Sequence, residues 1–288
     1  MATFKEFRNN VKPNWCPGCG DFSIQAAIQR AAANTELTPE ELAVISGIGC
    51  SGRISGYIHA YGLHGIHGRA LPIAQGVKLA NRDLTVIASG GDGDGFAIGM
   101  GHTIHAIRRN MNITYIVMDN QIYGLTKGQT SPRSAEGFVT KSTPSGSIET
   151  TLSPLELALS AGATFVAQSF SSDIKQLTAL IEEGIKHEGF SIINVFSPCV
   201  TFNKVNTYEW FKENIVNLDS FPDYDPSNRI QAMTKLMETG GLLTGLIYQD
   251  QSRKSYENQI QGFKETPLAQ QDLALTEEQF DHLMAEFR

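Results

Sequence analysis

The segment that most constrains the fold is an apolar run that leads directly into a glycine–aspartate cluster. Leu-Thr-Val-Ile-Ala-Ser at 84–89 reads as a buried strand, and Gly-Gly-Asp-Gly-Asp-Gly follows at 90–95. A stretch of small and apolar residues with helical character continues to about residue 109, before a second apolar run at 113–120. This strand–loop–helix–strand order is the βαβ pattern of a parallel sheet. It predicts an α/β fold.

The same alternation extends to both sides of this unit. Further strands are expected at 42–46, 163–168 and 190–198, and helices at 22–33, 73–82 (with Pro72 at the first helical position) and 173–187. We therefore expect a parallel sheet with helices on both faces in a domain spanning 1–200. Beyond it the periodicity weakens, and 201–288 is predicted to be a partner-contacting C-terminal extension with helices at 207–217, 227–239 and 276–287. The Gly-, Ser-, Thr- and Pro-rich segment 121–153 is expected to be a functional loop.

Charge and hydropathy exclude several classes of protein. With 23 basic and 30 acidic residues the net charge is −7, and no Lys/Arg block is present, which argues against nucleic acid as a partner. No apolar run approaches the roughly 20 residues of a membrane span, so no membrane partner is expected. The first fifteen residues lack the apolar core of a signal peptide, and the expected compartment is the cytoplasm.

The glycine–aspartate cluster is suited to a phosphate and a metal ion. In open parallel sheets ligands bind beyond the carboxyl ends of the strands, where helix N-termini offer free N–H groups. Mg²⁺ takes hard oxygen ligands, which Asp92 and Asn120 at the ends of two successive strands would supply. A glycine turn with a capping aspartate is the structural alternative, which the flanking strand, helix and asparagine make less favourable. A dinucleotide fingerprint fits poorly, because Gly91-x-Gly93 is followed by Phe96.

Four cysteines, at positions 16, 19, 50 and 199, stand in three separate predicted loops. Thiolates that converge from such loops suit zinc or an iron–sulfur cluster, and the residues alone do not separate the two. A redox Cys-x-x-Cys is the third possibility, although no strand precedes Cys16 as such a motif would require.

Several motifs occur together, in a fixed order. They are WCPGCGD, GIGCSGR, HGIHGRALPIAQGVKLAN, GGDGDGFAIGMGH, MDNQIYGLTKGQTSPR and FSPCVT. The combination closely resembles the β subunits of two-subunit 2-oxoacid:ferredoxin oxidoreductases, over most of residues 10–250. The spacing from Gly-Asp-Gly to Asn120 also looks like the thiamine diphosphate motif.

The resemblance implies a role for each matching residue. Cys16, Cys19, Cys50 and Cys199 would ligate one four-iron four-sulfur cluster, while Asp92, Asn120 and the Ile122 carbonyl would hold Mg²⁺. Thiamine diphosphate would be bound by Ile48, Gly49, Cys50, Ser51, His67, Gly68, Arg69, Gly91, Gly93, Asp94, Gly124 and Leu125. His67 and Lys127 would be catalytic, with Lys127 meeting the substrate carboxylate.

The resemblance also implies a reaction and partners. A 2-oxoacid would be oxidatively decarboxylated with coenzyme A to an acyl-CoA and CO₂, and electrons would pass to ferredoxin. The likeness favours 2-oxoglutarate over pyruvate, and Arg133 or Arg109 is a candidate for its distal carboxylate. The glutamate that activates the cofactor has no counterpart here, so it and most coenzyme A contacts would come from an α subunit. The alternatives are a non-redox thiamine decarboxylase and a zinc-stabilised, non-catalytic α/β scaffold.

Overall fold

The fold is organised around one eight-stranded sheet. The computed structural model describes residues 3–261, 266–272 and 274–287. Across the sheet the strands run in the order β2-β1-β3-β4-β6-β5-β8-β7. Their bounds are β1 Leu42–Ser46, β2 Tyr61–His64, β3 Thr85–Gly91, β4 Ile113–Asp119, β5 Phe165–Phe170, β6 Phe190–Phe196, β7 Val216–Asn217 and β8 Leu243–Gln249.

The sheet is mostly parallel. Strands β1 to β6 pair in parallel throughout, with Ile87 of β3 opposite Thr114 of β4, and Ile113 of β4 opposite Phe190 of β6. Only the β5–β8 pair is antiparallel among the described strands, and its register shifts between Val166 and Ala167. The parallel sheet predicted from the sequence is therefore confirmed, with two strands, β8 and β7, added at one edge and running against the others.

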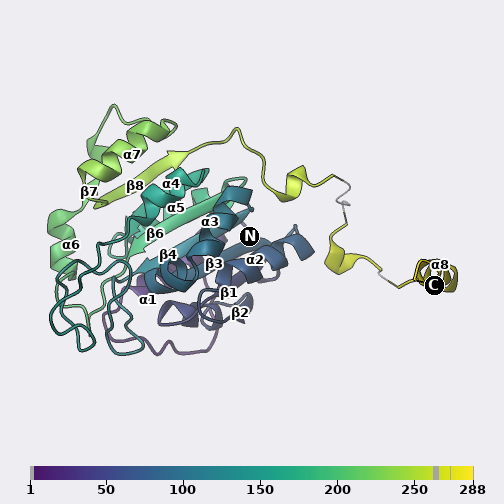
Figure 1. The fold of residues 1–288 in the computed structure, drawn as a ribbon, viewed down its shortest axis with the longest axis horizontal. Helices are drawn as coiled ribbons and strands as arrows, with labels where there is room; N and C mark the ends of the chain where they lie inside the picture. Colours follow the sequence, from purple (N-terminus) through teal and green to yellow (C-terminus); the bar gives the residue numbers. More distant parts are fainter. Residues whose placement is uncertain (1–2, 262–265, 273, 288) are drawn as a thin grey trace.

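Helices cover both faces of the sheet (Figure 1). Helices α1 (Asp21–Asn34) and α5 (Ile174–Lys186) contact each other on one face. On the other face lie α2 (Ala70–Ala80), α3 (Met100–Arg109), α4 (Pro154–Ser160) and α7 (Arg229–Glu238), whose buried side chains share one apolar cluster. Two helices remain, α6 (Tyr208–Asn214) and α8 (Glu277–Ala285).

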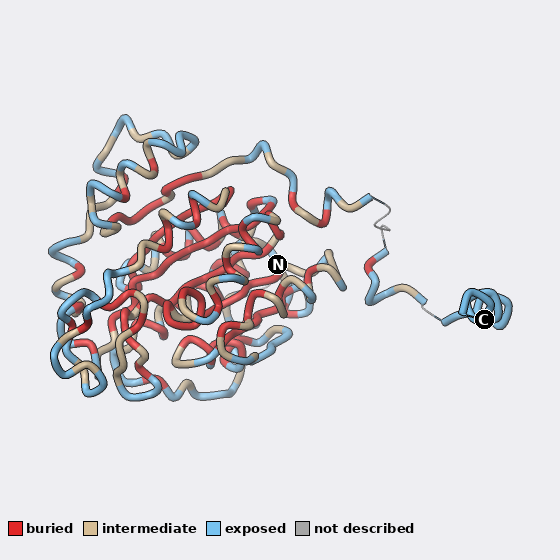
Figure 2. Tube along the Cα trace, in the orientation of Figure 1, coloured by how far each residue is buried: buried red, intermediate tan, exposed pale blue. Residues whose placement is uncertain are grey.

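Alternating side chains of the strands build these two cores. In β4, Tyr115 and Val117 pack with the α2–α3–α4 side, whereas Ile116 and Met118 pack with the α1–α5 side. Every residue of β1, β4, β5 and β6 is buried, as Figure 2 shows in red. Since both faces are covered, these strands carry continuous apolar runs, the property that identified them in the sequence.

Differences from the predicted elements are local. Helix α2 begins at Ala70, so Pro72 occupies its third position, where a missing N–H costs little because the first turn has no intrahelical acceptors. Strand β2 and helix α4 were not predicted, the first because its four residues are exposed and show no apolar run.

Beyond residue 200 the chain continues the same sheet. Helices α6, α7 and α8 confirm the three expected near 207–217, 227–239 and 276–287. Strand β8 was missed, since Gly245 at φ +123° interrupts its apolar pattern. All residues of α8 are exposed, and Figure 1 draws it apart from the sheet. None of the helices in the described ranges is both long and apolar enough to cross a membrane.

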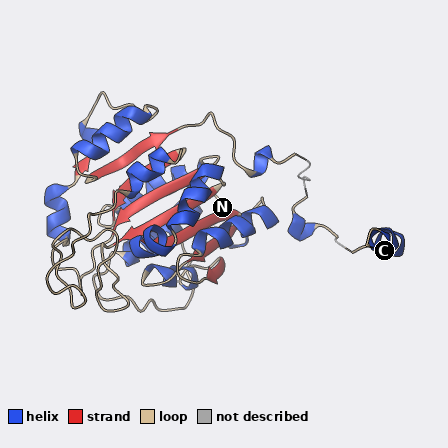
Figure 3. Cartoon of the chain, in the orientation of Figure 1, coloured by secondary structure: helices blue, strands red, loops and turns tan. Residues whose placement is uncertain are grey.

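Loops gather at one end of the sheet (Figure 3). The neighbouring parallel strands β1, β3, β4 and β6 all end there, at Ser46, Gly91, Asp119 and Phe196. The segments that follow them carry the glycine–aspartate cluster, Asn120 and two of the four cysteines. This edge is where ligands bind in open α/β sheets.

Candidate active site

Two adjoining cavities occupy the carboxyl edge of the sheet. The first has a volume of about 190 Å³ and the second about 360 Å³. Both are lined by Cys50, Asn120, Gly124 and Leu125, so these residues form a common wall. The remaining lining of the first cavity is Ile48, Gly49, Ser51, His67, Gly91, Asp92, Gly93, Asp94, Ile122, Tyr123 and Thr126.

The first cavity thus brings together most residues proposed for the cofactor and all three proposed for Mg²⁺. Gly68, Arg69 and Lys127 are outside its lining. Gly68 contacts Asp94 through its backbone N–H, and Arg69 is the N-cap of α2. Lys127 lines the second cavity instead, with a left-handed backbone at φ +78°.

The glycine–aspartate cluster begins at the end of β3 and enters a short π-helical turn, Asp94–Ile98, before α3. Such turns are frequent at functional sites. At Gly93 only hydrogen fits, because a Cβ there would lie 2.2 Å from the Tyr123 ring. The Tyr123 hydroxyl donates to the Gly93 carbonyl at 3.2 Å, so this tyrosine covers the glycine turn.

The side chain of Asp94 ties two loops to this turn. Its Oδ1 accepts hydrogen bonds from Ile48 N at 3.1 Å and Gly68 N at 2.8 Å, and His67 Nδ1 lies 2.7 Å away. The carboxylate is 3% exposed. The diphosphate contact that the resemblance implies for Asp94 stays a prediction, and in the structure its side chain holds the Ile48 and Gly68 loops together.

Asp92 has the chemistry of a cation ligand. It is buried, accepts a hydrogen bond from the Ser131 hydroxyl, and faces Asp119. Burial, and then the charge of Asp119, raises the pKa of Asp92 to about 8. A divalent cation beside this carboxylate would favour its ionised form, so the donor fits Mg²⁺.

The second predicted ligand lies in a strained turn. Asn120 follows β4 directly, and its Oδ1 accepts from Ile122 N at 3.1 Å. Between them Gln121 adopts φ +58°, the left-handed region that a residue with a side chain seldom occupies. The turn places both Asn120 and Ile122 in the lining of the first cavity, beside Asp92.

All four cysteines line the second cavity. Cys16 and Cys19 form a turn closed by Cys19 N donating to Cys16 O at 3.0 Å, and the Thr201 hydroxyl lies 3.1 Å from Cys16 Sγ. The sulfurs of Cys50 and Cys199 lie 3.7 and 3.6 Å from where a Cβ of residue 124 would stand.

Burial sets the electrostatics of these thiols. For Cys19 and Cys50, burial has the largest effect on the thiol pKa, and the charge of Asp21 has the next largest. Together they raise the pKa of Cys50 to about 12 and raise the pKa of Cys19 further. Thiols in such surroundings bind as thiolates only when a metal displaces the proton. In the part of the chain that the structure describes, no three His, Cys, Asp or Glu side chains form a group around a single ion.

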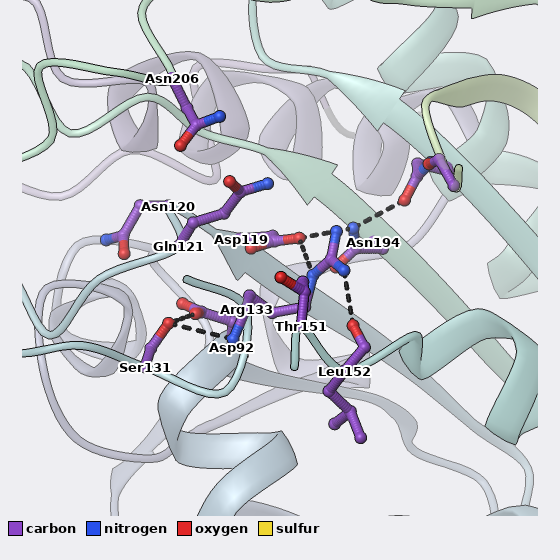
Figure 4. Close-up of polar contacts among 12 residues, drawn as sticks. Asp92, Asp119, Asn120, Gln121, Ser131, Arg133, Thr151, Leu152, Asn194 and Asn206 are labelled. Atoms are coloured by element: carbon purple, nitrogen blue, oxygen red, sulfur yellow. Dashed lines mark hydrogen bonds and ion pairs between the residues drawn. The ribbon is translucent and has the colours of Figure 1, made fainter. Parts of the chain in front are cut away.

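Two arginines proposed for the substrate are placed elsewhere. Arg133 is buried and donates through Nε to Asp119 Oδ2 at 3.0 Å (Figure 4). Arg109 lies in the last turn of α3 and donates to His105 O at 3.2 Å. Neither arginine lines either cavity, and the expectation that one of them binds a distal carboxylate stays a prediction.

Several residues of the site were not predicted. Trp15 donates from its indole to Cys50 O at 2.8 Å, Tyr123 contacts the Gly93 carbonyl, and Ser131 contacts Asp92, one of the proposed Mg²⁺ ligands. No spacing rule identifies them, because each acts across a fold contact rather than along the chain.

Comparison with known proteins agrees with this geometry. Residues 47–195 match the thiamine pyrophosphate enzyme C-terminal TPP binding domain, and residues 199–265 match the family described as the C terminal part of the pyruvate ferredoxin oxidoreductase beta subunit. The chain is 39% identical over 291 residues to subunit beta of 2-oxoacid:ferredoxin oxidoreductase 2 from Aeropyrum pernix, covering 96% of this chain and 94% of that one. It is 38% identical to 2-oxoglutarate synthase subunit KorB from Methanocaldococcus jannaschii, covering 76% and 84%.

A solved structure extends the likeness to three dimensions. The 2-oxoglutarate:ferredoxin oxidoreductase from Magnetococcus marinus, with 2-oxoglutarate, coenzyme A and succinyl-CoA bound, superposes with a TM-score of 0.86 at 41% identity. The match covers 89% of this chain and 88% of that chain. Together, the matched fold and the relatives confirm the resemblance drawn from the motifs: the chain belongs to the family of 2-oxoacid:ferredoxin oxidoreductase β subunits.

Proposed function

We propose that the chain, together with an α subunit, converts a 2-oxoacid and coenzyme A to an acyl-CoA and CO₂, with ferredoxin as the electron acceptor. One 2-oxoacid, one coenzyme A thiol and two oxidised ferredoxins give one acyl-CoA, one CO₂, two reduced ferredoxins and one proton. The observation that carries this proposal is the pair of adjoining cavities with a common wall, one with oxygen ligands and glycines, the other with four thiols.

The first cavity is assigned to thiamine diphosphate and Mg²⁺. Asp92, Asn120 and the Ile122 carbonyl would hold the cation, and Gly91, Gly93 and Gly124 leave the space that the diphosphate needs. When bound, thiamine diphosphate supplies the carbanion and the electron sink for decarboxylation of a 2-oxoacid. The chain itself would position the cofactor, because Asp94 holds the Ile48 and Gly68 loops against the glycine-rich turn at 90–95.

The second cavity is assigned to one four-iron four-sulfur cluster. All four cysteines line this cavity, and four thiolates are the ligand set of a cubane cluster. Trp15 fixes the Cys50 backbone, and the Thr201 hydroxyl contacts the Cys16 sulfur. The wall of Cys50 and Gly124 keeps the two groups adjacent, as one-electron transfer between them requires.

The rest of the active site is assigned to the partner. Among the described residues, no glutamate lines either cavity, so the acid that activates the cofactor would come from the α subunit, with most coenzyme A contacts. Lys127, exposed at the mouth of the second cavity, would meet the carboxylate of the substrate. We favour 2-oxoglutarate as that substrate because the Methanocaldococcus relative and the Magnetococcus structure are both named for it.

The test is a cofactor analysis of the complex purified without oxygen together with its partner subunit. We expect about four iron, four sulfide and one thiamine diphosphate per chain, since a cubane holds four of each, and reduction of a viologen dye with 2-oxoglutarate faster than with pyruvate. In a Cys199→Ser variant the iron should fall while thiamine remains. Zinc in place of iron would overturn the redox assignment, and iron without thiamine would overturn the assignment of the first cavity.

A further inference from the structure

A four-residue segment of the long loop, Ser-Pro-Arg-Ser at 131–134, contacts the residues that frame the proposed Mg²⁺ ligands. We name this segment the latch. Its three polar side chains are at least nine-tenths buried, with Ser131 5%, Arg133 9% and Ser134 4% exposed. Each of them reaches a different point of the metal-ligand region. Figure 4 shows Ser131 and Arg133 directed toward Asp92 and Asp119.

The first two contacts hold the ends of two strands. The Ser131 hydroxyl donates to Asp92 Oδ2, which leaves Asp92 Oδ1 as the oxygen without this contact. Arg133 Nε donates to Oδ2 of Asp119, the residue directly before Asn120, at 3.0 Å. The same Asp119 oxygen also accepts from Asn194 at 3.1 Å, so its orientation is fixed from two sides.

The third contact holds the strained turn. The Ser134 hydroxyl donates to the Gln121 carbonyl at 2.7 Å and accepts from Ser131 N at 2.9 Å. Gln121 is the left-handed residue between Asn120 and Ile122, and such a strained conformation persists only when its surroundings hold it. A fixed Gln121 carbonyl fixes the peptide plane between Gln121 and Ile122. The Ile122 N–H of that plane donates to Asn120 Oδ1 at 3.1 Å, so the contact also orients the Asn120 side chain.

The latch is itself anchored to the far end of the loop. Leu152 N donates to Pro132 O at 2.9 Å, and Arg133 Nη1 donates to Leu152 O at 2.6 Å. The Thr151 hydroxyl donates to Ser134 O at 3.1 Å. The latch is therefore held by residues 151–152 on one side and by the Gln121 carbonyl on the other.

We propose that the latch is a positioning element that presets the oxygen ligands for Mg²⁺ and disfavours Ca²⁺; this rests on the assignment of Mg²⁺ to the first cavity. Mg²⁺ demands near-octahedral ligands at about 2.0–2.1 Å, whereas Ca²⁺ accepts longer and less regular contacts at about 2.3–2.6 Å. A turn held by three buried contacts maintains the shorter geometry. Loosening the turn therefore lowers the affinity for Mg²⁺ more than the affinity for Ca²⁺.

The experiment measures thiamine diphosphate binding by calorimetry to the complex with its partner subunit, stripped of divalent ions by EDTA, with either Mg²⁺ or Ca²⁺ added back. Ser131→Ala and Ser134→Ala are compared with Ser142→Ala, an exposed serine of the same loop whose hydroxyl lies 3.1 Å from that of Thr140 at the surface. The bond from Ser134 to the Gln121 carbonyl is neutral and corresponds to about a five-fold change in affinity, and the bond from Ser131 to the Asp92 carboxylate to at least as much. We expect the Mg²⁺-supported Kd to rise about five-fold in Ser134→Ala and at least that much in Ser131→Ala, and the Ca²⁺-supported Kd to rise less than two-fold in both.

Other outcomes overturn the proposal. Equal weakening with both cations, accompanied by a lower Tm of the stripped complex, would mean that the latch only stabilises the fold. Unchanged Kd values in both latch variants would mean that the turn keeps its geometry unaided. If the wild-type complex bound no thiamine diphosphate with either cation, the assignment of the first cavity would itself fail, and that result differs from all the others because it appears before any substitution.

Discussion

Replacing Asp94 by asparagine removes a charge while keeping the shape of the side chain that joins two loops. Its Oδ1 accepts from two backbone donors, Ile48 N at 3.1 Å and Gly68 N at 2.8 Å. A hydrogen bond to a charged group contributes about 1.5–3 kcal/mol and a neutral one about 0.5–1.5 kcal/mol. The substitution should therefore reduce the unfolding free energy by about 1 kcal/mol per backbone bond, about 2 kcal/mol together.

Asp94→Ala is expected to cost more, about 3 kcal/mol, because the buried Gly68 N–H and the part-buried Ile48 N–H then lose their acceptor at about 1–3 kcal/mol each, the more exposed one at the low end. Solvent screening gives little relief, since Asp94 is 3% exposed. Asp173→Asn is the matched control: this aspartate caps α5 at the surface through one bond, to Gln176 N at 3.0 Å, and asparagine caps equally well.

The measurement is urea-induced unfolding followed by tryptophan fluorescence and by circular dichroism, and the free energy is read only where the two transitions coincide. Because the Ile48 and Gly68 loops border the first cavity, the affinity for thiamine diphosphate should fall in the same order as the stability. A loss below about 0.5 kcal/mol for Asp94→Asn, the range of ordinary surface substitutions, would refute the view that this carboxylate holds the loops.

Three further substitutions probe other contacts. Gly93→Ala would place a Cβ 2.2 Å from the Tyr123 ring, so we expect loss of thiamine diphosphate binding in calorimetry, partly restored when Tyr123→Ala is added. Burial lowers the pKa of His187 from its ordinary 6.5, so below about pH 6.5 the unfolded chain binds a proton that the folded chain does not. The free energy of unfolding should therefore fall as the pH drops below about 6.5. His187→Gln should make this fall smaller, as measured by urea midpoints from pH 7.5 to 5.5. Asn110 sits at φ +56° and its side chain bonds Thr164, Phe190 and the 253–254 backbone; Asn110→Gly keeps the backbone conformation yet should lower the Tm by several degrees in calorimetry.

The sequence was sufficient for the architecture wherever burial was complete. Strands β1, β3, β4 and β6 carry apolar runs because both of their faces are covered, and each run ends in a recognisable polar or glycine segment. The convergence of Asp92 and Asn120 followed from strand order alone, since the carboxyl ends of neighbouring parallel strands share one edge. Strand β8 escaped because a glycine at φ +123° interrupts it.

Contacts between distant segments could not be predicted in the same way. Arg133 is fourteen residues from Asp119, and a lone arginine in a polar loop suggests a ligand contact as readily as a buried ion pair. Trp15 and Cys50 are thirty-five residues apart, with an indole N–H donating to a backbone carbonyl, a contact that leaves no spacing signal. The assignment of individual residues to cofactor, substrate and cluster remains a prediction, as does the cytoplasmic location.

The wall common to the two cavities makes them a linked system in the thermodynamic sense. A group in either cavity would contact Cys50 and Gly124, and these same residues line the other cavity. If filling one cavity changes the affinity of the other by some factor, the reverse effect has the same factor, because the cycle of binding steps must close. A favourable coupling would make half-filled chains scarce during assembly, and an unfavourable one would make them abundant.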